Sequence, residues 1–306
     1  MEKDGTYPLI RERVENTYSH VALLCGFVSG ALLLIVCIGL YVSLKMPDDN
    51  AYQLFVGLAG LWWLVLGAIS VESFELRPGP KRPSEHNFFV HSWSSIFEIV
   101  RDIRDYPQAL LFLLLYFFYS DGISTVSSVG ILFAQRDLCM RPSEAVIIAI
   151  IIPLSAAVGN YIFLQLQRLT QIPSKIMLLI NLYFFALLAA WGCIGLLTDK
   201  FGLHKKWEIY LFGVFYGLNL GSSSSYSRTL FTDFIPPGRE ARFFSLYGIT
   251  DRGSSWIGPL MVAVIVQSTG AIRLAMLYLL FALLVPSVLV QIFVNHEEGR
   301  RQSGRH

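Results

Sequence analysis

Four charged side chains lie inside runs of the sequence that are otherwise apolar: Asp121, Arg228, Asp251 and Arg252. A charge at bilayer depth costs roughly 2.5 to 3.5 kcal/mol on insertion scales, so a facing partner, a water-filled cavity or the membrane interface must offset it. Ionisable residues that persist inside a membrane often mark the path of a substrate or an ion. The four positions therefore predict a polar pathway between membrane helices.

Asp121 is the first candidate because it lies near the middle of its run, at about the thirteenth residue. Its short side chain cannot reach the interface from there. We interpret Asp121 as a carboxylate that faces a cavity or pairs with an opposite charge. The alternative is a protonated Asp121 that forms a hydrogen bond between helices. The first interpretation requires a void beside this side chain.

The other three charges have different surroundings. Arg228 lies four or five residues from the end of its run, so an interface anchor is the alternative to a role in the pathway. Asp251 and Arg252 are adjacent, and a helix points them about 100° apart, which predicts that they contact different partners rather than each other. Asp233 follows at the end of the same run as Arg228, and we interpret it as a boundary residue.

The elements that position these residues must be membrane helices. Of 306 residues, 54% are hydrophobic and 15% are charged, whereas a spanning helix needs roughly 20 apolar residues. Nearly uncharged runs of that length occur at 18–42, 53–71, 109–134, 145–166, 176–197, 209–232, 243–268 and 274–294. Backbone polar groups must be satisfied inside each segment in hydrocarbon, and the alternating short strands of a barrel are absent from the pattern. The predicted fold class is an all-α polytopic membrane protein with about eight transmembrane helices.

Composition also excludes several functions. The net charge of +2 and the scattered basic residues give no electrostatic support for nucleic-acid binding. The four cysteines and six histidines show no metal-ligand spacing, and no phosphate loop or catalytic constellation is present, so we expect no cofactor, no metal and no enzyme. The bilayer itself is the first expected partner.

The distribution of lysine and arginine predicts the orientation. Eight spans place both termini on one side, and the segments on that side hold 15 basic residues against 7 in the other connections. The positive-inside bias therefore places both termini in the cytosol.

One long connection divides the predicted spans into two and six. It contains a Pro-rich stretch at 76–83 and then, at 93–103, apolar residues at helical spacing. The second part predicts an amphipathic helix that lies flat on the membrane surface or packs on the spans themselves. The predicted organisation is an N-terminus at 1–17, two spans at 18–72, a linker at 73–108, six spans at 109–294 and a tail at 295–306.

Polar side chains are concentrated in three of the predicted spans. The runs at 109–134, 209–232 and 243–268 carry the four charges and most of the hydroxyl groups, which is expected if these helices line a cavity. The candidate pathway residues are Asp121, Asn219, Arg228, Asp251, Arg252, Tyr119, Ser222 and Ser254. Some of the small residues are expected only to pack helices, as with Gly217 and Gly221, which form a small-xxx-small pair.

Several stretches carry a resemblance to a known family. They are Gly60–Trp63 (GLWW), Arg77–Pro80 (RPGP), Tyr119–Gly122 (YSDG), Phe234–Glu240 (FIPPGRE), Phe243–Pro259 (FFSLYGITDRGSSWIGP) and Thr269–Arg273 (TGAIR). Together they resemble the autophagy-related protein 22 family, a fungal vacuolar branch of the major facilitator superfamily. The resemblance runs from about the first span to the end of the chain.

The resemblance implies a twelve-helix secondary transporter that exports amino acids from the vacuole to the cytosol, with substrate bound near the bilayer midplane between two six-helix halves. It implies that this chain holds the last two helices of the N-terminal half and all six of the C-terminal half, and lacks the first four. Asp121, Asp251 and Arg252 match the family's charged motifs. A fragment, a chain that works with another subunit and a chain that no longer transports are all open alternatives.

The resulting expectation is a multi-pass vacuolar membrane transporter of neutral amino acids, active in autophagy. Asp121 would be the proton-responsive or ammonium-binding group, and Arg252 or Arg228 would bind the carboxylate. The expected partners are lipid, an amino acid and protons. The rival hypothesis is a non-transporting scaffold or regulator that binds lipid or a protein through the region 93–103.

Overall fold

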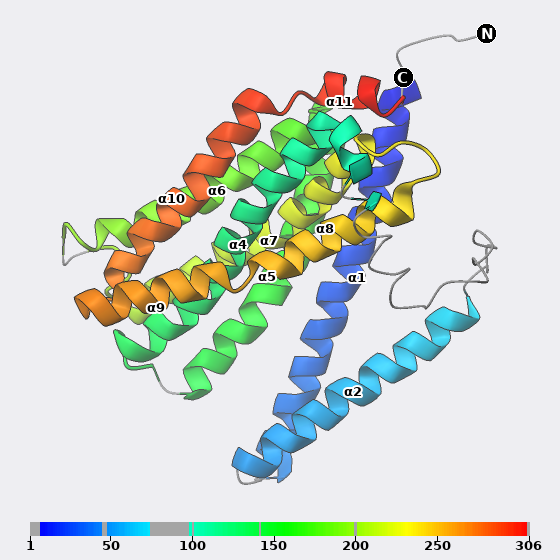
Figure 1. Cartoon of the computed structure of the whole chain (residues 1–306). Coiled ribbons are helices and arrows are strands. Elements are labelled where there is room, and N and C mark those ends of the chain that lie inside the picture. Colours follow the sequence, from blue (N-terminus) through cyan, green and yellow to red (C-terminus); the bar gives the residue numbers. More distant parts are fainter. Residues whose placement is uncertain are drawn as a thin grey trace.

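The computed structural model describes residues 7–44, 48–73, 98–99, 101–140, 142–198 and 201–304, and these are helical with no strand among them. The elements in chain order are α1 (Tyr7–Leu44), α2 (Asp48–Glu72), the short helix η1 (Ile103–Asp105), α4 (Pro107–Arg136), α5 (Pro142–Thr170), α6 (Ser174–Ile194), α7 (Lys206–Asp233), α8 (Glu240–Ser254), α9 (Ile257–Thr269), α10 (Arg273–Phe293) and α11 (His296–Gln302) (Figure 1). The predicted all-α membrane class is confirmed.

Six of these helices, namely α1, α2, α4, α5, α6 and α10, are long and apolar enough to cross a membrane. The other two predicted spans differ for physical reasons. Helix α7 has 28 residues, but its serine-rich middle makes it more polar. The run at 243–268 is divided into α8 and α9, which have 15 and 13 residues. Both of these predicted spans carry charged residues: Arg228 lies in α7, and Asp251 and Arg252 lie in α8.

Close packing of α5 on α7 depends on small residues. A Cβ atom at Gly217 would lie 2.5 Å from the carbonyl oxygen of Ile152, and one at Gly221 would lie 2.7 Å from that of Ala156. Larger side chains would force the two helices apart. The prediction that Gly217 and Gly221 form a close helix contact is therefore confirmed.

The start of α1 and helix α11 lie at the same end of the bundle, which we call the terminal end (Figure 1). Helix α1 packs on α5 and α7, whereas α2 begins near the end of α1 at the opposite, far end and diverges from the bundle. The residues at 7–17, predicted as part of a polar N-terminus, form the start of α1. Their polar groups do not prevent this, because Glu12 and Asn16 are buried and hydrogen-bonded to Ser174.

The described end of the long connection packs on the helices. Ile99 and Ile103 are buried in the core, with exposed fractions of 9% and 2%, and Asp102 forms an ion pair of 3.4 Å with Arg239. These residues favour a segment packed on the spans rather than one lying free on the membrane surface. The Pro-rich stretch at 76–83 and most of the predicted amphipathic helix lie outside the described residues.

Candidate functional site

A polar cavity of about 350 Å³ lies between α4, α7 and α8. These are the elements formed by the three runs that carry the charges. Its lining residues are Tyr116, Tyr119, Ser120, Ile123, Ser124, Ser127 and Ser128 from α4, Tyr216, Leu220, Ser223, Ser224 and Ser227 from α7, and Asp251 from α8. The volume is in the range of small-molecule sites. A half-open cavity with so many hydroxyl groups between apolar helices is a candidate binding site.

Asp251 supplies the negative charge of the cavity. Its Oδ1 atom accepts hydrogen bonds from the hydroxyl of Tyr116 at 2.6 Å and from that of Ser120 at 2.8 Å. Both donors come from α4, so they hold the carboxylate of α8 across the helix interface. Such charge-assisted bonds fix its position without neutralising it. The side chain of Asp251 is 37% exposed, which leaves it accessible to a ligand.

Hydroxyl groups form most of the remaining polar wall. Several of them bond within their own helix, as Ser224 does to the carbonyl of Leu220 at 3.0 Å. A hydroxyl has two acceptor lone pairs and one proton that rotates, so these groups can reorient toward a bound molecule. No lysine, arginine or histidine is among the described residues that line the cavity. The arrangement therefore favours a small polar ligand with a cationic group.

Asp121 does not line this cavity. Its Oδ1 atom accepts a hydrogen bond of 3.0 Å from the backbone N–H of Gly258, in the first turn of α9. The side chain is buried, with 4% of the residue exposed. This is the bond between helices that the sequence left as the alternative. Asp121 thus lies against the N-terminus of α9, whose first N–H groups lack helical partners, and not in the cavity.

The break between α8 and α9 explains why a carboxylate is needed there. Ser255 and Trp256 leave the regular helix, so the first N–H groups of α9 lose their partners from the preceding turn. Gly258 allows a very close approach, since a Cβ at this position would overlap the hydroxyl of Thr125. The predicted span at 243–268 is therefore interrupted at its centre, between α8 and α9.

Three other predicted pathway residues have structural partners. Asn219 donates to the carbonyl of Phe215 in its own helix at 2.8 Å, Ser222 donates to Asn181 of α6, and Ser254 donates to the carbonyl of Asp251 at 3.2 Å. None of the three lines the cavity. They act in the structure as contacts within and between helices.

The two predicted arginines lie outside the cavity as well. Arg228 is exposed, as expected of an interface anchor. The side chain of Arg252 is 91% exposed, and its Nε atom lies 4.0 Å from Oδ2 of Asp251, at the outer limit of an ion pair. The prediction that these neighbours do not contact each other was wrong, because their side chains bend toward one another despite the helical offset.

Tyr119 and Asp251 are thus the predicted pathway residues that the structure brings together. Residues missing from the predicted set include Ser120, Ser124 and Ser227, although the hydroxyl-rich spans themselves were identified. The signal was their spacing: Ser120 and Ser124 are four residues apart and lie on one face of α4. A ranking of residues by charge and membrane depth alone omits the hydroxyl groups on this face of α4.

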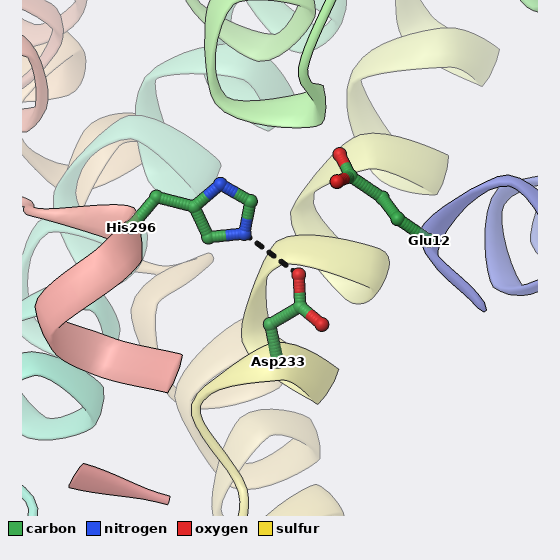
Figure 2. Close-up of side chains that lie close together, drawn as sticks. All are labelled: Glu12, Asp233 and His296. Carbon is green, nitrogen blue, oxygen red and sulfur yellow. Dashed lines mark hydrogen bonds and ion pairs between the residues drawn. The ribbon is translucent and has the colours of Figure 1, made fainter. Parts of the chain in front are cut away.

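A second polar cluster lies at the terminal end of the bundle. Figure 2 shows Glu12 of α1, Asp233 of α7 and His296 of α11 pointing toward one another, with a 2.7 Å bond between His296 Nε2 and Asp233 Oδ2. One ligand atom from each residue lies within 4.8 Å of the other two, a spacing that would also suit a metal ion. A positive charge already lies between the two carboxylates, however, because Arg300 contacts both.

Arg300 organises this cluster. Its Nη2 atom lies 2.8 Å from Glu12 Oε2 and 2.8 Å from Asp233 Oδ2. Burial alone would lower the pKa of Arg300, but the two carboxylates raise it above its ordinary value. Asp233 is only 3% exposed. The interpretation of Asp233 as a boundary residue is therefore wrong, since it joins α7 to α11.

Comparison with known proteins gives consistent matches. A family model described as "Vacuole effluxer Atg22 like" matches residues 7–304. The chain is 31% identical over 305 residues to autophagy-related protein 22-1 of Aspergillus fumigatus, which covers 95% of this chain and 50% of that protein. It is 32% identical over 311 residues to the protein of the same name from Penicillium rubens, with 98% and 52% covered. Identity to autophagy-related protein 22 of Botryotinia fuckeliana is 32%, with 97% and 46% covered. The chain thus spans about half the length of these relatives.

Proposed function

This chain belongs to the family of vacuole effluxer Atg22-like proteins, and from that premise we propose that it acts in a multi-pass vacuolar membrane transporter that exports neutral amino acids to the cytosol during autophagy. The observation that carries the proposal is the cavity of about 350 Å³, walled by hydroxyl groups and one carboxylate inside an apolar helical bundle. Membrane proteins place polar groups at such depth where a substrate passes.

Asp251 is the proposed binding group for the amino acid's ammonium. The hydrogen bonds from Tyr116 and Ser120 fix its Oδ1 atom, no basic side chain is among the described lining residues, and the exposed Arg252 approaches its Oδ2 atom only to 4.0 Å. The hydroxyl groups of Ser124, Ser223 and their neighbours would then bind the carboxylate of the substrate. If protons are carried, we assign the proton-responsive role to Asp251 as well, because it has access to the cavity and Asp121 does not.

The organisation of the chain supports a two-part transporter. Residues 18–72 would complete the N-terminal half, 73–108 would form the central cytosolic linker, 109–294 would form the six-helix C-terminal half, and 295–306 would form the tail. Contacts of α1 with α5 and α7 then join the two halves. The start of α1 and helix α11 share one end of the bundle, and we assign that end to the cytosol on the basic bias.

The test is amino-acid binding and efflux by the purified chain. Radiolabelled leucine would be measured on the protein in detergent and in proteoliposomes, for the unchanged chain, Asp251→Asn and a control, Asp102→Asn, whose carboxylate lies outside the cavity. Loss of a charge-assisted bond worth about 1.5–3 kcal/mol predicts binding roughly 10- to 100-fold weaker in Asp251→Asn and unchanged in Asp102→Asn.

Two results would overturn the proposal. One is equal leucine binding by Asp251→Asn and the unchanged chain, which would remove the cavity from substrate recognition. The other is a folded chain that moves no amino acid but purifies with a stable partner protein, which would establish the scaffold hypothesis instead.

A further inference from the structure

Between the cavity and the terminal end lies a buried group of aromatic side chains, which we call the aromatic cluster: Phe112, Tyr116, Phe231, Phe234 and Tyr247. Tyr116 also lines the cavity and stacks on Tyr247 at a centroid distance of 4.3 Å. Phe231 stacks on Tyr247 at 5.4 Å and on Phe112 at 6.1 Å. Because α4 begins and α7 ends at the terminal end, these rings separate the cavity from that end.

Helix α11 packs directly on the outer edge of the aromatic cluster. Phe234 lies against Gly299 so closely that a Cβ at Gly299 would overlap the ring. The ring of His296 lies 6.1 Å from the ring of Phe234. The hydroxyl of Ser303 donates to the carbonyl of Asp233 at 2.8 Å. The end of α7 is therefore held against α11 by both packing and hydrogen bonds.

The same short helix also holds α1 and α4. Arg300 contacts Glu12 of α1, whose second oxygen accepts a bond of 2.7 Å from the backbone N–H of Ser174. The backbone N–H of Gln108, at the start of α4, donates to Gln302 at 3.2 Å. Helix α11 thus joins the terminal ends of three long helices, two of which carry the rings of the aromatic cluster.

We propose that α11 is a strap that keeps the cavity closed at the terminal end, and that its release from Glu12 and Phe234 must accompany opening of the aromatic cluster toward that side. The inference rests on the proposed function in one respect, namely that the cavity is the substrate path. Arg300 is the positioning residue, since it acts through Asp233 and Glu12 rather than on a substrate. Gly299 supplies the close contact with Phe234.

Two substitutions test the ion pairs of Arg300 and the packing of Gly299 on Phe234 separately. Arg300→Gln removes the guanidinium that joins Glu12 to Asp233, and Gly299→Ala adds an atom that the ring of Phe234 must move to admit. Arg301→Gln is the matched control, because Arg301 is 71% exposed and pairs within α11, with Glu298 at 2.9 Å. Glu12→Gln is a milder fourth variant that keeps an acceptor oxygen for Arg300.

The readout is access to the cavity from the terminal end. A reporter cysteine replaces the cavity residue Ser224 in a background in which the native Cys25, Cys37, Cys139 and Cys193 are substituted. Sealed vesicles receive a membrane-impermeant maleimide on the side where a C-terminal tag is sensitive to protease. Arg300→Gln is expected to label about tenfold faster than the reference, as expected for loss of a charge-assisted contact, and Glu12→Gln by less. Gly299→Ala is expected to label faster as well, because the added atom forces the ring of Phe234 away from α11. Arg301→Gln should label at the reference rate.

Equal labelling of the reference and of Arg300→Gln and Gly299→Ala would overturn the strap, provided that their melting temperatures show folded protein. An equal increase in Arg301→Gln would overturn it too. If Arg300→Gln does not fold, Glu12→Gln and Gly299→Ala decide by the same criterion. Labelling needs no transport, so a chain that labels as expected but moves no leucine would retain the strap and lose the proposed function.

Discussion

Asp121 is expected to stabilise the fold rather than to bind substrate, and its substitution by alanine measures this. Its carboxylate accepts the N–H of Gly258 at 3.0 Å in a site that is 4% exposed. Asp121→Ala leaves that donor unpaired, which costs about 1–3 kcal/mol for a buried group, close to the 0.5–2 kcal/mol for loss of a helix cap. A loss of about 2 kcal/mol corresponds to a melting temperature roughly 4–8 °C lower.

Asp121→Asn is the discriminating variant. Asparagine keeps an acceptor oxygen and is as good a helix cap as aspartate, so its melting temperature should stay within roughly 1–2 °C of the unchanged chain. Leucine binding should be unchanged, because Asp121 does not line the cavity. The assay is thermal unfolding in detergent followed by tryptophan fluorescence, with Trp256 at the junction as a local reporter, combined with leucine binding.

The opposite pattern would refute this assignment. If Asp121→Asn abolished leucine binding or the pH dependence of efflux while its melting temperature remained normal, Asp121 would act in the pathway, as the sequence first suggested. A normal melting temperature for Asp121→Ala would also show that the bond to Gly258 contributes little.

Four further substitutions test contacts elsewhere in the bundle. Gly159→Ala should lower the melting temperature by several degrees, because its Cβ would overlap the carbonyl of Leu218. Gly130→Ala is the control: its Cβ would meet its nearest neighbour at 3.9 Å, so thermal unfolding should show a neutral or slightly stabilising effect. Arg273→Lys should cost about 1–2 kcal/mol in unfolding experiments, because lysine cannot reproduce both the contact over the Phe133 ring at 5.2 Å and the bond to Asp137 at 3.3 Å. Glu208→Ala should destabilise the far end by about 1–3 kcal/mol, measured as faster local hydrogen exchange, since Glu208 accepts two buried backbone N–H groups.

The sequence predicts the helices well where local composition decides them. An uncharged run of about 20 residues in lipid has one stable conformation, the helix, so α4, α5, α6 and α10 lie where the runs predicted them. The run at 243–268 fails this reasoning because its helix breaks at Ser255 and Trp256, just before Pro259 of the same run, whose ring disfavours a continuous helix. The run gives no sign, however, that the N–H of Gly258 is bound by Asp121, 137 residues away in the chain.

The candidate site shows the same limit. Asp121 and Asp251 carry the same charge within neighbouring helices, so the cost of burial ranks them alike. What differs is the group that offsets the cost, a helix N-terminus for Asp121 and a hydroxyl-lined cavity for Asp251. Only the arrangement of the helices shows which of these two groups lies beside each carboxylate. The contact of Glu12 with Arg300, separated by 288 residues, was likewise beyond reach of any local pattern.

Helix α4 holds the two sides of the broken helix separately, and this links the proposed substrate site to the aromatic cluster. Ser120 and Tyr116 bind Asp251 at the end of α8, whereas Asp121 binds the start of α9. An ammonium that binds Asp251 draws on the same carboxylate charge as the two hydroxyls, so it weakens their bonds, which attach α8 to α4, while α9 stays capped. Helix α8 also carries Tyr247, which stacks on Tyr116. Occupation of the cavity would therefore loosen the aromatic cluster from its inner side, as release of α11 loosens it from its outer side.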